Sequence, residues 1–548
     1  MARVKIGEIL QTKNLINKNQ LQIALVQQKI TGELLGDAVV NLGFVTSKEL
    51  GQALAEQAGV DFIDLSQYPI SEEALKLIPK DVAQLTGFIP IEITDGRLSI
   101  GVTNPSNIIA VDKVTSITSN QPKVYMVDPD NFRESLEKGY FFLENPIQQS
   151  REKILAEIKE TKTAGGPAVT SLSDLIIMDG IRRNATDVHI SPAADVVHIF
   201  YRIDGVMHHG HSLPRIVHAG IISRIKILSK LDIAETRLPQ DGSFTFDFLN
   251  KGYDIRVSTV PTIYGENVVI RILAGTGPLL RVENLGFNDH DVKIIKSLFQ
   301  KPYGVILIAG PTGSGKTTTL YAALREINLL ERNVITVEDP VEYKLSLTKQ
   351  SQVNEKAGYD FAFAARNFMR QDPDVMLIGE IRDEETARIA VRTSITGHLV
   401  LSTIHSNDAV TAVPRLMDLK VDKYLVSSSL LAIVAQRLAR RICRFCITDH
   451  DLSDEDHKLF SEYGIQLDKA YRGIGCPKCN GSGYAGRLVI GEILAIDDEL
   501  KDLIYSDVPI TVLQTTAMRK GMIPLKQDGL NKVAQGIISL DELLRVTG

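Results

Sequence analysis

The sequence predicts an α/β protein of several domains, and three observations carry this expectation. The chain has 548 residues, of which 44% are hydrophobic and 23% charged, which is enough for three or four folded domains. In its second half, short apolar runs end in glycines or acidic residues and lead into helix-like segments. The four cysteines of the chain form two CxxC pairs. We therefore expect an α/β core with a cysteine-rich insertion.

The core is expected to begin with a phosphate-binding loop. Residues 310–318 read GPTGSGKTT and directly follow the apolar run 305–309, while a helical pattern continues over 318–328. Glycines in such a loop let the backbone turn its N–H groups toward phosphate oxygens. Lys316 supplies a cation for the β- and γ-phosphates, and Thr317 supplies a hydroxyl for Mg²⁺. The residues expected to bind a nucleoside triphosphate are Gly310, Pro311, Thr312, Gly313, Ser314, Gly315, Lys316, Thr317 and Thr318.

A second apolar run, 375–378, is followed by Gly379 and Glu380. A carboxylate at the end of a core strand can bind metal or activate the attacking water. Gly379 stands where an aspartate usually ligates the metal, so metal ligation is not expected at that position. Glu380 is therefore the expected catalytic base, which orients or deprotonates water.

Two further strand ends carry candidate catalytic groups. The run 334–337 leads into Glu338 and Asp339, which are candidates to hold Mg²⁺ through water, and Glu338 is also the second candidate for the base. The run 399–404 delivers His405, whose position suits a sensor of the γ-phosphate. A lone histidine is more often structural, and that alternative stays open for His405.

The cysteines are expected to bind zinc. Cys443 pairs with Cys446, and Cys476 pairs with Cys479, within an insertion expected at 440–490. Four thiolates with this spacing suit tetrahedral Zn²⁺. Two disulfides or free thiols are the alternatives, but a reducing cytosol disfavours disulfides. Because four protein ligands leave no open position for water, the zinc is expected to be structural.

Taken together, these motifs resemble the secretion ATPases that assemble type IV pili and type II secretion pseudopili, over nearly the whole chain. The blocks that carry the resemblance are GPTGSGKTT, ITVEDPVEY (335–343), IGEIRDEETA (378–387), TGHLVLSTIHSNDA (396–409), RNATDVHISP (183–192), YRIDG (201–205) and RLPQDG (237–242). The resemblance implies a RecA-like P-loop ATPase core with a zinc-binding insertion and a helical C-terminal end. It also implies a sensor-like, PAS-like α/β domain before that core.

The resemblance further implies roles for arginines of the sensor-like domain. In this family, the equivalents of Arg224 and Arg237 approach the γ-phosphate when the domain closes on the nucleotide, and Arg256 lies in a similar block, as a further nucleotide-binding candidate. An arginine on a mobile domain would couple closure to phosphate charge, so that hydrolysis releases the domain. The alternative is that these arginines are ordinary solvated surface charges.

The N-terminal region contains an internal repeat. Residues 6–28 align with residues 35–57 at an offset of 29 residues. Apolar residues fall at helical spacing in each half, so each half is expected to form two short helices. The turn residues are Asn14 and Gly43, and the helix-start residues are Asn17 and Thr46. One interpretation of the repeat is a helical docking unit.

The other interpretation is that residues 1–60 resemble the N-terminal domain by which some of these ATPases bind cyclic di-GMP. That domain carries a similar motif twice with a five-residue spacer, which here would be residues 29–33. The family motif usually starts with arginine, whereas this chain has Lys5 and Leu34. This departure weakens the contact expected in one half and removes it from the other.

The remaining N-terminal segments complete the domain plan. Strand signals on both sides of an Asp95-Gly96 turn predict a hairpin of residues 87–94 and 97–102. The polar segment 145–170, with its Gly-Gly-Pro break, predicts a linker. The expected parts are an N-terminal regulatory or docking domain at 1–144 (repeat 5–57, α/β module 61–143), a flexible linker at 145–170, the sensor-like domain at 171–285 and the ATPase domain at 286–548.

The resemblance implies a homo-hexameric ring that uses ATP and Mg²⁺, with structural Zn²⁺ and cyclic di-GMP as a regulator. The ring would dock at the cytoplasmic face of the inner membrane against a polytopic platform protein and other assembly proteins. The chain has no apolar run of about 18 residues, so we expect a cytoplasmic protein that reaches the membrane through partners. The insertion and front domain favour assembly over pilus retraction, and pilus assembly and type II secretion remain tied.

Two other functional classes are alternatives to an assembly ATPase. A nucleic-acid-translocating P-loop motor is possible for a chain with a zinc site, but the net charge of −6 and the lack of a long basic block argue against a nucleic-acid partner. A signalling protein that binds cyclic nucleotides, with vestigial hydrolysis, is the third hypothesis. Steady ATP turnover would reject that third hypothesis.

Overall fold

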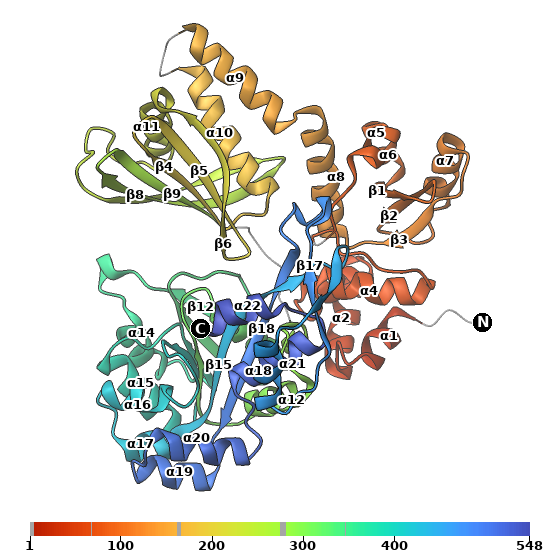
Figure 1. The fold of residues 1–548 in the computed structure, drawn as a ribbon. Helices are drawn as coiled ribbons and strands as arrows, with labels where there is room; N and C mark the ends of the chain where they lie inside the picture. The colour runs from red at the N-terminus through yellow and green to blue at the C-terminus, as the bar shows by residue number, and fades with distance from the viewer. Residues whose placement is uncertain (1–4, 67, 162–165, 274–280, 346) are drawn as a thin grey trace. The chain divides into compact units, whose positions relative to one another are not determined.

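The computed structural model describes residues 5–66, 68–161, 166–273, 281–345 and 347–548 (Figure 1). The chain divides into two compact units, Met1–Pro278 and Leu279–Gly548. Among the described residues, no helix combines the length and the apolar character that crossing a bilayer requires.

The first four helices repeat one two-helix unit, as the sequence predicted. They are α1 (Ile6–Thr12), α2 (Lys18–Thr31), α3 (Leu35–Asn41) and α4 (Ser47–Ala58). Asn17 and Thr46 each cap the second helix of their half through a capping box, in which side chain and backbone exchange hydrogen bonds. Asn14 and Gly43 both take positive φ angles, of 54° and 74°, in the turn between the helices.

Packing inside the two halves follows the same offset. An ideal Cβ built on Gly7 would lie 3.1 Å from Leu21, and one built on Gly36 would lie 3.1 Å from Leu50. Each glycine therefore lets the two helices of its half approach closely. The expected spacer, residues 29–33, is only partly a spacer, because α2 continues to Thr31 before Gly32 ends it with a φ of 75°.

An α/β module follows the repeat. Its elements are α5 (Glu72–Leu77), α6 (Lys80–Thr86), β1 (Phe88–Thr94), β2 (Arg97–Val102), α7 (Ile108–Thr118), β3 (Lys123–Met126) and α8 (Pro129–Glu144). The predicted hairpin is confirmed, since β1 and β2 pair antiparallel. Asp95 and Gly96 both have positive φ angles, of 51° and 73°, as a two-residue type I′ hairpin turn requires.

The segment 145–170, predicted as a flexible linker, is helical for most of its length. Residues Ile147–Thr161 form helix α9, and α10 begins at Pro167. Residues 162–165 lie outside the described part of the chain. Ile154, Leu155 and Ile158 face the core of the following domain, and Ile158 is buried. These apolar residues recur at helical spacing, but the polar residues around them made the composition resemble a linker.

The second domain of the first unit is a six-stranded antiparallel sheet with strand order β6-β5-β4-β9-β8-β7. Its elements are α10 (Pro167–Arg182), β4 (Asp187–Pro192), β5 (Val196–Ile203), β6 (Val206–Pro214), α11 (His218–Leu228), β7 (Gln240–Phe248), β8 (Lys251–Thr262) and β9 (Gly265–Leu273). Strand β5 alternates in burial, with Val197, Ile199 and Tyr201 turned into the core. Helix α8 joins this sheet through an ion pair of 2.6 Å between Glu134 and Lys251.

The second unit is built on a seven-stranded sheet with strand order β12-β11-β13-β14-β10-β15-β18. Neighbouring strands run parallel except for β18, which is antiparallel to β15. The sheet elements and their helices are α12 (Asp289–Phe299), β10 (Gly304–Ala309), α13 (Lys316–Glu326), β11 (Val334–Glu338), β12 (Lys349–Gln352), α14 (Phe361–Phe368), β13 (Val375–Ile378), α15 (Glu384–Ile395), β14 (Leu399–Ile404), α16 (Ala412–Asp418), α17 (Lys423–Ser429), β15 (Leu430–Ile442) and β18 (Tyr484–Ala495).

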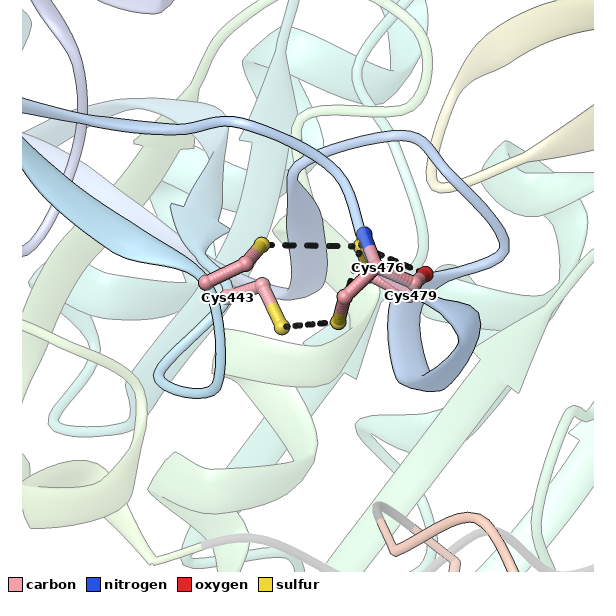
Figure 2. Close-up of side chains that lie close together, drawn as sticks. Cys443, Cys476 and Cys479 are labelled. Carbon is pink, nitrogen blue, oxygen red and sulfur yellow. Dashed lines mark hydrogen bonds between the residues drawn. The ribbon is translucent and has the colours of Figure 1, made fainter.

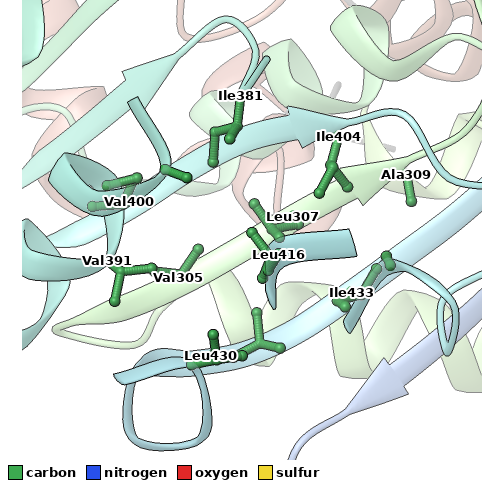
Figure 3. Packing of buried hydrophobic residues seen from close by; sticks show 14 of the residues in the cluster. Val305, Leu307, Ala309, Ile381, Val391, Val400, Ile404, Leu416, Leu430 and Ile433 are labelled. Atoms are coloured by element: carbon green, nitrogen blue, oxygen red, sulfur yellow. The ribbon is translucent and has the colours of Figure 1, made fainter. Parts of the chain in front are cut away.

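Helices cover both faces of this sheet, which explains why its central strands are continuously apolar. Every residue of β10 is buried. Val305, Leu307 and Ala309 lie on one face, in a cluster with Val400 and Ile433 of the neighbouring strands (Figure 3). The alternate residues of β10 pack on the other face against α12 and α13.

The remaining elements follow or interrupt the last two strands. Between β15 and β18 lie β16 (Ile447–Asp451), α18 (Asp454–Glu462) and β17 (Lys469–Gly473), and after β18 come α19 (Asp498–Tyr505), α20 (Ile510–Arg519), α21 (Leu525–Ala534) and α22 (Leu540–Thr547). The outward edge of β18 has partners of its own. The Val489 amide donates to the Leu285 carbonyl at 2.8 Å, and the Gly491 amide donates to the Asp528 carboxylate at 2.9 Å.

Candidate active site and metal centre

The phosphate-binding loop has the backbone that its glycines predict. Gly310, Gly313 and Gly315 have φ angles of 151°, 79° and 86°, which side chains rarely tolerate. An ideal Cβ on Gly310 would lie 2.5 Å from the Ser314 hydroxyl and 2.7 Å from the Gln436 carbonyl. The loop is therefore a concave turn that a larger side chain at Gly310 would disrupt.

Lys316 opens helix α13 and reaches back over the loop. Its Nζ donates to the carbonyls of Gly310 at 2.9 Å and Pro311 at 3.1 Å. Burial, followed by the nearby Arg437 guanidinium, lowers the pKa of Lys316 below its ordinary value. Thr317 is exposed in the first turn of the same helix. Its hydroxyl is therefore accessible to a metal ion, beside a helix N-terminus that favours anions.

The parallel sheet brings the other predicted groups to the same edge as the loop. In the register, Ala309 pairs with Ile404, and Ile378 pairs with Ser402. The carboxyl ends of β10, β13 and β14 therefore lie side by side. Glu380 and His405, which follow two of these ends, meet there, with 3.7 Å between the Glu380 carboxylate and His405 Nε2.

The surroundings of this pair suit a site for phosphate chemistry. Glu380 forms an ion pair with Arg382, and its side chain is 16% exposed. Burial, then the charges of Lys316, Arg382 and Arg415, lower the pKa of His405. A neutral imidazole is therefore favoured next to these cations. The influence of Lys316 on His405 indicates that the loop and the histidine share one site.

Gly379 has a steric reason to replace the usual aspartate. An ideal Cβ at this position would lie 3.0 Å from the Phe361 ring and 3.2 Å from the Val337 carbonyl. A carboxylate side chain would need both neighbours to move. Glu380 is therefore the carboxylate that follows β13 most closely.

Glu338 differs from Glu380 in its hydrogen bonds. Its buried carboxylate accepts hydrogen bonds from Tyr321 at 2.5 Å, Thr336 at 2.7 Å and Gln350 at 3.1 Å. Both oxygens are thus occupied by protein donors, which link β11 to α13 and β12. The adjacent Asp339 is exposed. This arrangement favours a structural role for Glu338 over a role as the base.

Two polar residues at this edge, Gln436 and Arg437 of β15, were not predicted. The Gln436 side chain contacts Ser314 and Thr319, and the Arg437 guanidinium donates to the Asn407 carbonyl at 2.8 Å. The only signal in the sequence is a glutamine and an arginine at the end of the apolar run 430–435. Their partners lie far away along the chain, so that signal did not point to the loop.

A pocket of about 500 Å³ opens beside the loop. It is lined by Gly310, Pro311, His405, Ser406, Asn407, Asp408, Thr411, Pro414, Arg415 and Asp418. The pocket thus joins the first residues of the loop to the segment after β14. Its lining combines apolar surface with charged side chains of both signs, Asp408, Asp418 and Arg415, as is usual for a ligand site with a few polar groups.

The four cysteines come together as predicted (Figure 2). Their Sγ atoms all lie within 4.8 Å of one another, and the Cys443–Cys476, Cys446–Cys479 and Cys476–Cys479 distances are 3.9, 3.8 and 3.7 Å. A tetrahedral site with Zn–S bonds of about 2.3 Å requires S···S distances of about 3.8 Å. None of the four forms a disulfide. The cluster therefore fits zinc with four thiolate ligands.

The second CxxC pair is also prepared electrostatically for a cation. Burial alone would raise the pKa of Cys479, but the backbone amides of Cys476 and Gly483 donate to its sulfur and bring the pKa to about 7. Both N–H···S distances are 3.2 Å. The thiolate form of Cys479 is therefore accessible at neutral pH, whereas burial raises the pKa of Cys443 and of Cys446.

Of the three predicted arginines of the first unit, Arg224 and Arg237 lie close to acidic partners. Arg224 lies 3.6 Å from Asp174, and Arg256 is half-buried on β8. Arg237 is 85% exposed, and the Glu235 carboxylate accepts from its Nε at 3.1 Å and from its terminal nitrogen at 2.9 Å. Glu235 thus holds the guanidinium in one orientation on the surface.

The loop that carries Arg237 is anchored by a buried cation. Lys226 of α11 is almost completely buried, and its Nζ donates to the Glu235 carbonyl at 2.7 Å. The same Nζ lies 2.7 Å from the Glu266 carboxylate, which balances its charge. Sequence reasoning did not select Lys226, because a lysine is rarely buried and its partners come from separate strands and loops.

Two family models match parts of this chain. Residues 162–545 match the family model described as "Type II/IV secretion system protein", and residues 58–140 match the "MshEN domain" model. The second match begins where the helical repeat ends.

Two curated relatives match this chain over nearly their full lengths. "Type IV pilus assembly ATPase PilB" of Myxococcus xanthus is 38% identical over 98% of each chain. "Type II secretion system protein E" of Xanthomonas campestris pv. campestris is 34% identical over 100% of this chain and 99% of its own. Among solved structures, the Legionella pneumophila ATPase DotB is 20% identical, covers 68% of this chain and 94% of its own, and has a TM-score of 0.50. This last likeness concerns the fold alone.

Proposed function

The chain belongs to the type II/IV secretion system protein family, and from this membership we propose that it is an ATP-hydrolysing motor for assembly of a type IV pilus or a type II secretion pseudopilus. The observation that carries the proposal is the full-length match to curated relatives named for these two machines. The polar edge of the sheet, with its phosphate loop and Glu380, supports ATP hydrolysis. The nucleic-acid-translocating alternative has no support from these matches.

The proposed roles at the site follow from its geometry. The loop amides and Lys316 would bind the β- and γ-phosphates. Glu380 would orient and deprotonate the attacking water, because its carboxylate lies at the strand ends while that of Glu338 is occupied. Thr317 would hold Mg²⁺, with Asp339 acting through water, and the ion would neutralise phosphate charge. His405 would sense the γ-phosphate next to Glu380.

We further propose that the first unit delivers arginines to the nucleotide during the cycle of a homo-hexameric ring. The support is the exposed, oriented guanidinium of Arg237, together with Arg224 and Arg256 in the same PAS-like, sensor-type domain. Charge that develops on the phosphate would draw these arginines in, and hydrolysis would release them. Such closure of this domain on the RecA-like core would be the force-producing step.

The metal proposed for the cysteine cluster is Zn²⁺ in a structural role. With four thiolates, no coordination position is open for a substrate. Cys443 and Cys446 end β15, whereas Cys476 and Cys479 precede β18, so the ion would clamp the two ends of the insertion together. The metal would thereby add folding energy to that of the apolar cluster around Phe460 in the same insertion.

The repeat at residues 1–60 is proposed as a regulatory site for cyclic di-GMP. Lys5 and Leu34 occupy equivalent N-cap positions of α1 and α3, and Leu34 is exposed with Val26 and Ile30 of α2. These apolar side chains offer surface for the guanine bases. Calorimetry on the full chain should show binding that Gly36→Trp abolishes and Lys316→Ala retains, and the absence of heat at tens of micromolar ligand would leave a docking unit.

A stimulation assay tests the motor proposal. The purified full chain should hydrolyse ATP faster when a polytopic platform protein of its machine is added in detergent. Single-stranded DNA, added at an equal concentration of charged groups, should not change the rate of ATP hydrolysis. Stimulation by the DNA and not by the platform protein would contradict the proposal and favour a nucleic-acid motor.

The choice between the two machines needs a cellular assay. Expression of the chain in strains that lack their own pilus-assembly or secretion ATPase should restore pili or secretion, according to the machine that it serves. We propose that the protein acts as a peripheral protein at the cytoplasmic face of the inner membrane. The expressed protein should therefore sediment with membranes only when the platform protein is present.

A further inference from the structure

Gln436 is a completely buried polar residue at the carboxyl edge of the sheet. Its exposed fraction is 0%, although it lies in β15, the strand next to the phosphate loop strand β10. A buried side-chain amide is costly unless its donor and its acceptor both find partners. Gln436 meets this requirement entirely with the loop and its helix.

The amide binds both ends of the loop-to-helix turn. Its Nε2 donates to the Ser314 carbonyl at 2.7 Å, and its Oε1 accepts from the Thr319 hydroxyl at 2.8 Å. Ser314 lies within the loop, and Thr319 is in the first turn of α13. One side chain thus fixes the distance between the loop backbone and the helix whose N-terminus faces the phosphates.

The glycines of the loop are fitted around this residue. A Cβ on Gly310 would lie 2.7 Å from the backbone carbonyl oxygen of Gln436, and a Cβ on Gly315 would lie 3.3 Å from the side-chain Nε2 of Gln436. Two of the loop glycines therefore approach Gln436 as well as supplying backbone freedom. The loop rests on β15 at this point.

We infer that Gln436 is a positioning residue of the nucleotide site, which holds the phosphate loop at the correct height above the sheet. This inference rests on the proposed binding of ATP by the loop. Gln436 contacts neither the substrate nor the reacting atoms, so its effect passes through Ser314 and Thr319. Its neighbour Arg437 supplies a second link, since it binds the Asn407 carbonyl two residues after His405. Adjacent residues of one strand thus fix the loop and the histidine segment relative to each other.

The test replaces Gln436 with methionine, which keeps the length of the side chain and removes both hydrogen bonds. Titration of the full chain with a fluorescent ATP analogue should give a Kd raised about tenfold, because the loop loses both hydrogen bonds that hold it in its binding conformation. KM for ATP should rise in parallel, while kcat changes much less, because the loop binds the phosphates in the ground state as well as in the transition state.

Three further variants separate positioning from general stability. Thr319→Val removes one of the two hydrogen bonds and should give a smaller rise in Kd, and adding it to Gln436→Met should cost little more. Ser429→Ala removes a buried hydrogen bond of 2.6 Å just before β15, far from the loop along that strand, and should lower Tm without changing Kd. Lys316→Ala reports whether the assay follows this loop, and it should abolish binding.

An unchanged Kd for both Gln436→Met and Thr319→Val, with binding lost in Lys316→Ala, would overturn the inference and leave the ATP-binding loop in place. If Lys316→Ala also kept the parental Kd, the nucleotide would bind elsewhere and the assignment of the loop would fail as well. Should Gln436→Met not fold, Thr319→Val alone must raise the Kd for the inference to stand.

Discussion

Individual carboxylates near the phosphate loop differ in what surrounds them, and these surroundings separate their roles. The oxygens of Glu338 accept hydrogen bonds from Tyr321, Thr336 and Gln350, and its side chain is buried. Glu380 instead faces His405 and Arg382 at the strand ends. Two adjacent strands thus have glutamates at or just after their ends with different surroundings, one hydrogen-bonded within the fold and one proposed for proton transfer.

We expect Glu380→Gln to bind ATP with nearly the parental affinity and to lose at least about a hundredfold in kcat, since the amide cannot accept the proton of water. The measurement is a pair of assays on the same preparation, binding of a fluorescent ATP analogue and steady-state phosphate release. Lys316→Ala should show the opposite pattern, in which the main loss is in the affinity for ATP.

A matched control for this prediction is Glu385→Gln. Glu385 is an exposed glutamate of α15 that pairs with Arg366 on the surface, and its replacement should leave both assays unchanged. If Glu380→Gln hydrolysed ATP at the parental rate, Glu380 would have no part in the chemical step. Glu338 would then be the next candidate for the base.

The residues that the sequence revealed are those whose neighbours in the chain carry the signal. The loop glycines, Lys316 and the CxxC pairs belong to compact motifs, and His405 ends a clear apolar run. Gln436 was missed because its partner Ser314 lies 122 residues away, so the interaction exists only after β15 has paired with β10. The sequence predicted Glu380 as the base and Glu338 as the second candidate, but it did not show that Tyr321 and Gln350 occupy the Glu338 carboxylate, because these donors come from other segments.

Among the elements, the same distinction holds. The four helices of the repeat were predictable because capping residues and turn residues recur at one offset. Helix α9 was not, because its apolar face only becomes recognisable when the core that it covers is present. Polar composition indicates a linker, but three well-spaced apolar residues, Ile154, Leu155 and Ile158, suffice to dock a helix.

The metal-binding insertion should be more stable with its ion than without it. We expect purified protein to contain about one zinc per chain, and Cys476→Ser to lose that metal and several degrees of the thermal midpoint of its unit. Metal analysis and thermal unfolding of the same samples check this. Ser482→Ala, which removes a hydrogen bond to the Cys479 carbonyl but no sulfur, is the matched control and should keep the metal.

A zinc content well below one per chain, with four titratable thiols in the native protein, would argue against the site. The measured S···S distances would then reflect four packed thiols. Retention of zinc by Cys476→Ser would indicate instead that the ion is bound elsewhere in the chain.

Helix α22 is tied to β15 by a buried carboxylate with two arginine partners. Glu542 accepts hydrogen bonds from Arg440 at 2.8 Å and from Arg545 at 2.6 Å. Burial alone would raise the pKa of Glu542, but these hydrogen bonds outweigh it and hold the pKa below its ordinary value. The ionised form therefore stabilises the folded state.

Because the folded pKa of Glu542 is depressed, its stabilisation is fully present above the unfolded value, about 4.3, and is lost as the pH falls through the folded value. Glu542→Gln should therefore lower the stability of the second unit by about 3 kcal/mol at pH 7. The difference from the parent should shrink progressively below about pH 4. Denaturant unfolding at several pH values measures it, and a difference that does not depend on pH would contradict the role of the charge.

On the scale of the whole molecule, the two units divide the proposed work. The unit Leu279–Gly548 contains the loop, Glu380 and the cysteine cluster, whereas the unit Met1–Pro278 contains the oriented arginines and the repeat. A domain that carries charge to a phosphate held by another domain can convert hydrolysis into displacement. The activity of the whole chain should therefore depend on residues that lie outside the nucleotide-binding unit.

We expect Arg237→Ala to lower kcat by more than about tenfold while changing ATP affinity little, because its charge would act in the transition state. In rings assembled from mixtures of parent and variant, activity should fall faster than the parental fraction if subunits act cooperatively. Arg97→Ala, which removes an exposed arginine from the hairpin strand β2, should leave turnover unchanged. If Arg237→Ala and the parent had equal kcat, Arg237 would be an ordinary surface charge.

The covered edge of β18 constrains how copies of this chain can associate. With the Val489 amide bound to Leu285 and the Gly491 amide bound to Asp528, a neighbouring chain cannot add a strand to the sheet there. Subunits must then meet through side chains at this edge, without a continuous ladder of backbone hydrogen bonds between them. Side-chain contacts can break and re-form individually. One subunit can therefore shift against the next without disrupting a sheet that both subunits share. The covered edge also gives the partly folded chain less opportunity to form fibrous aggregates.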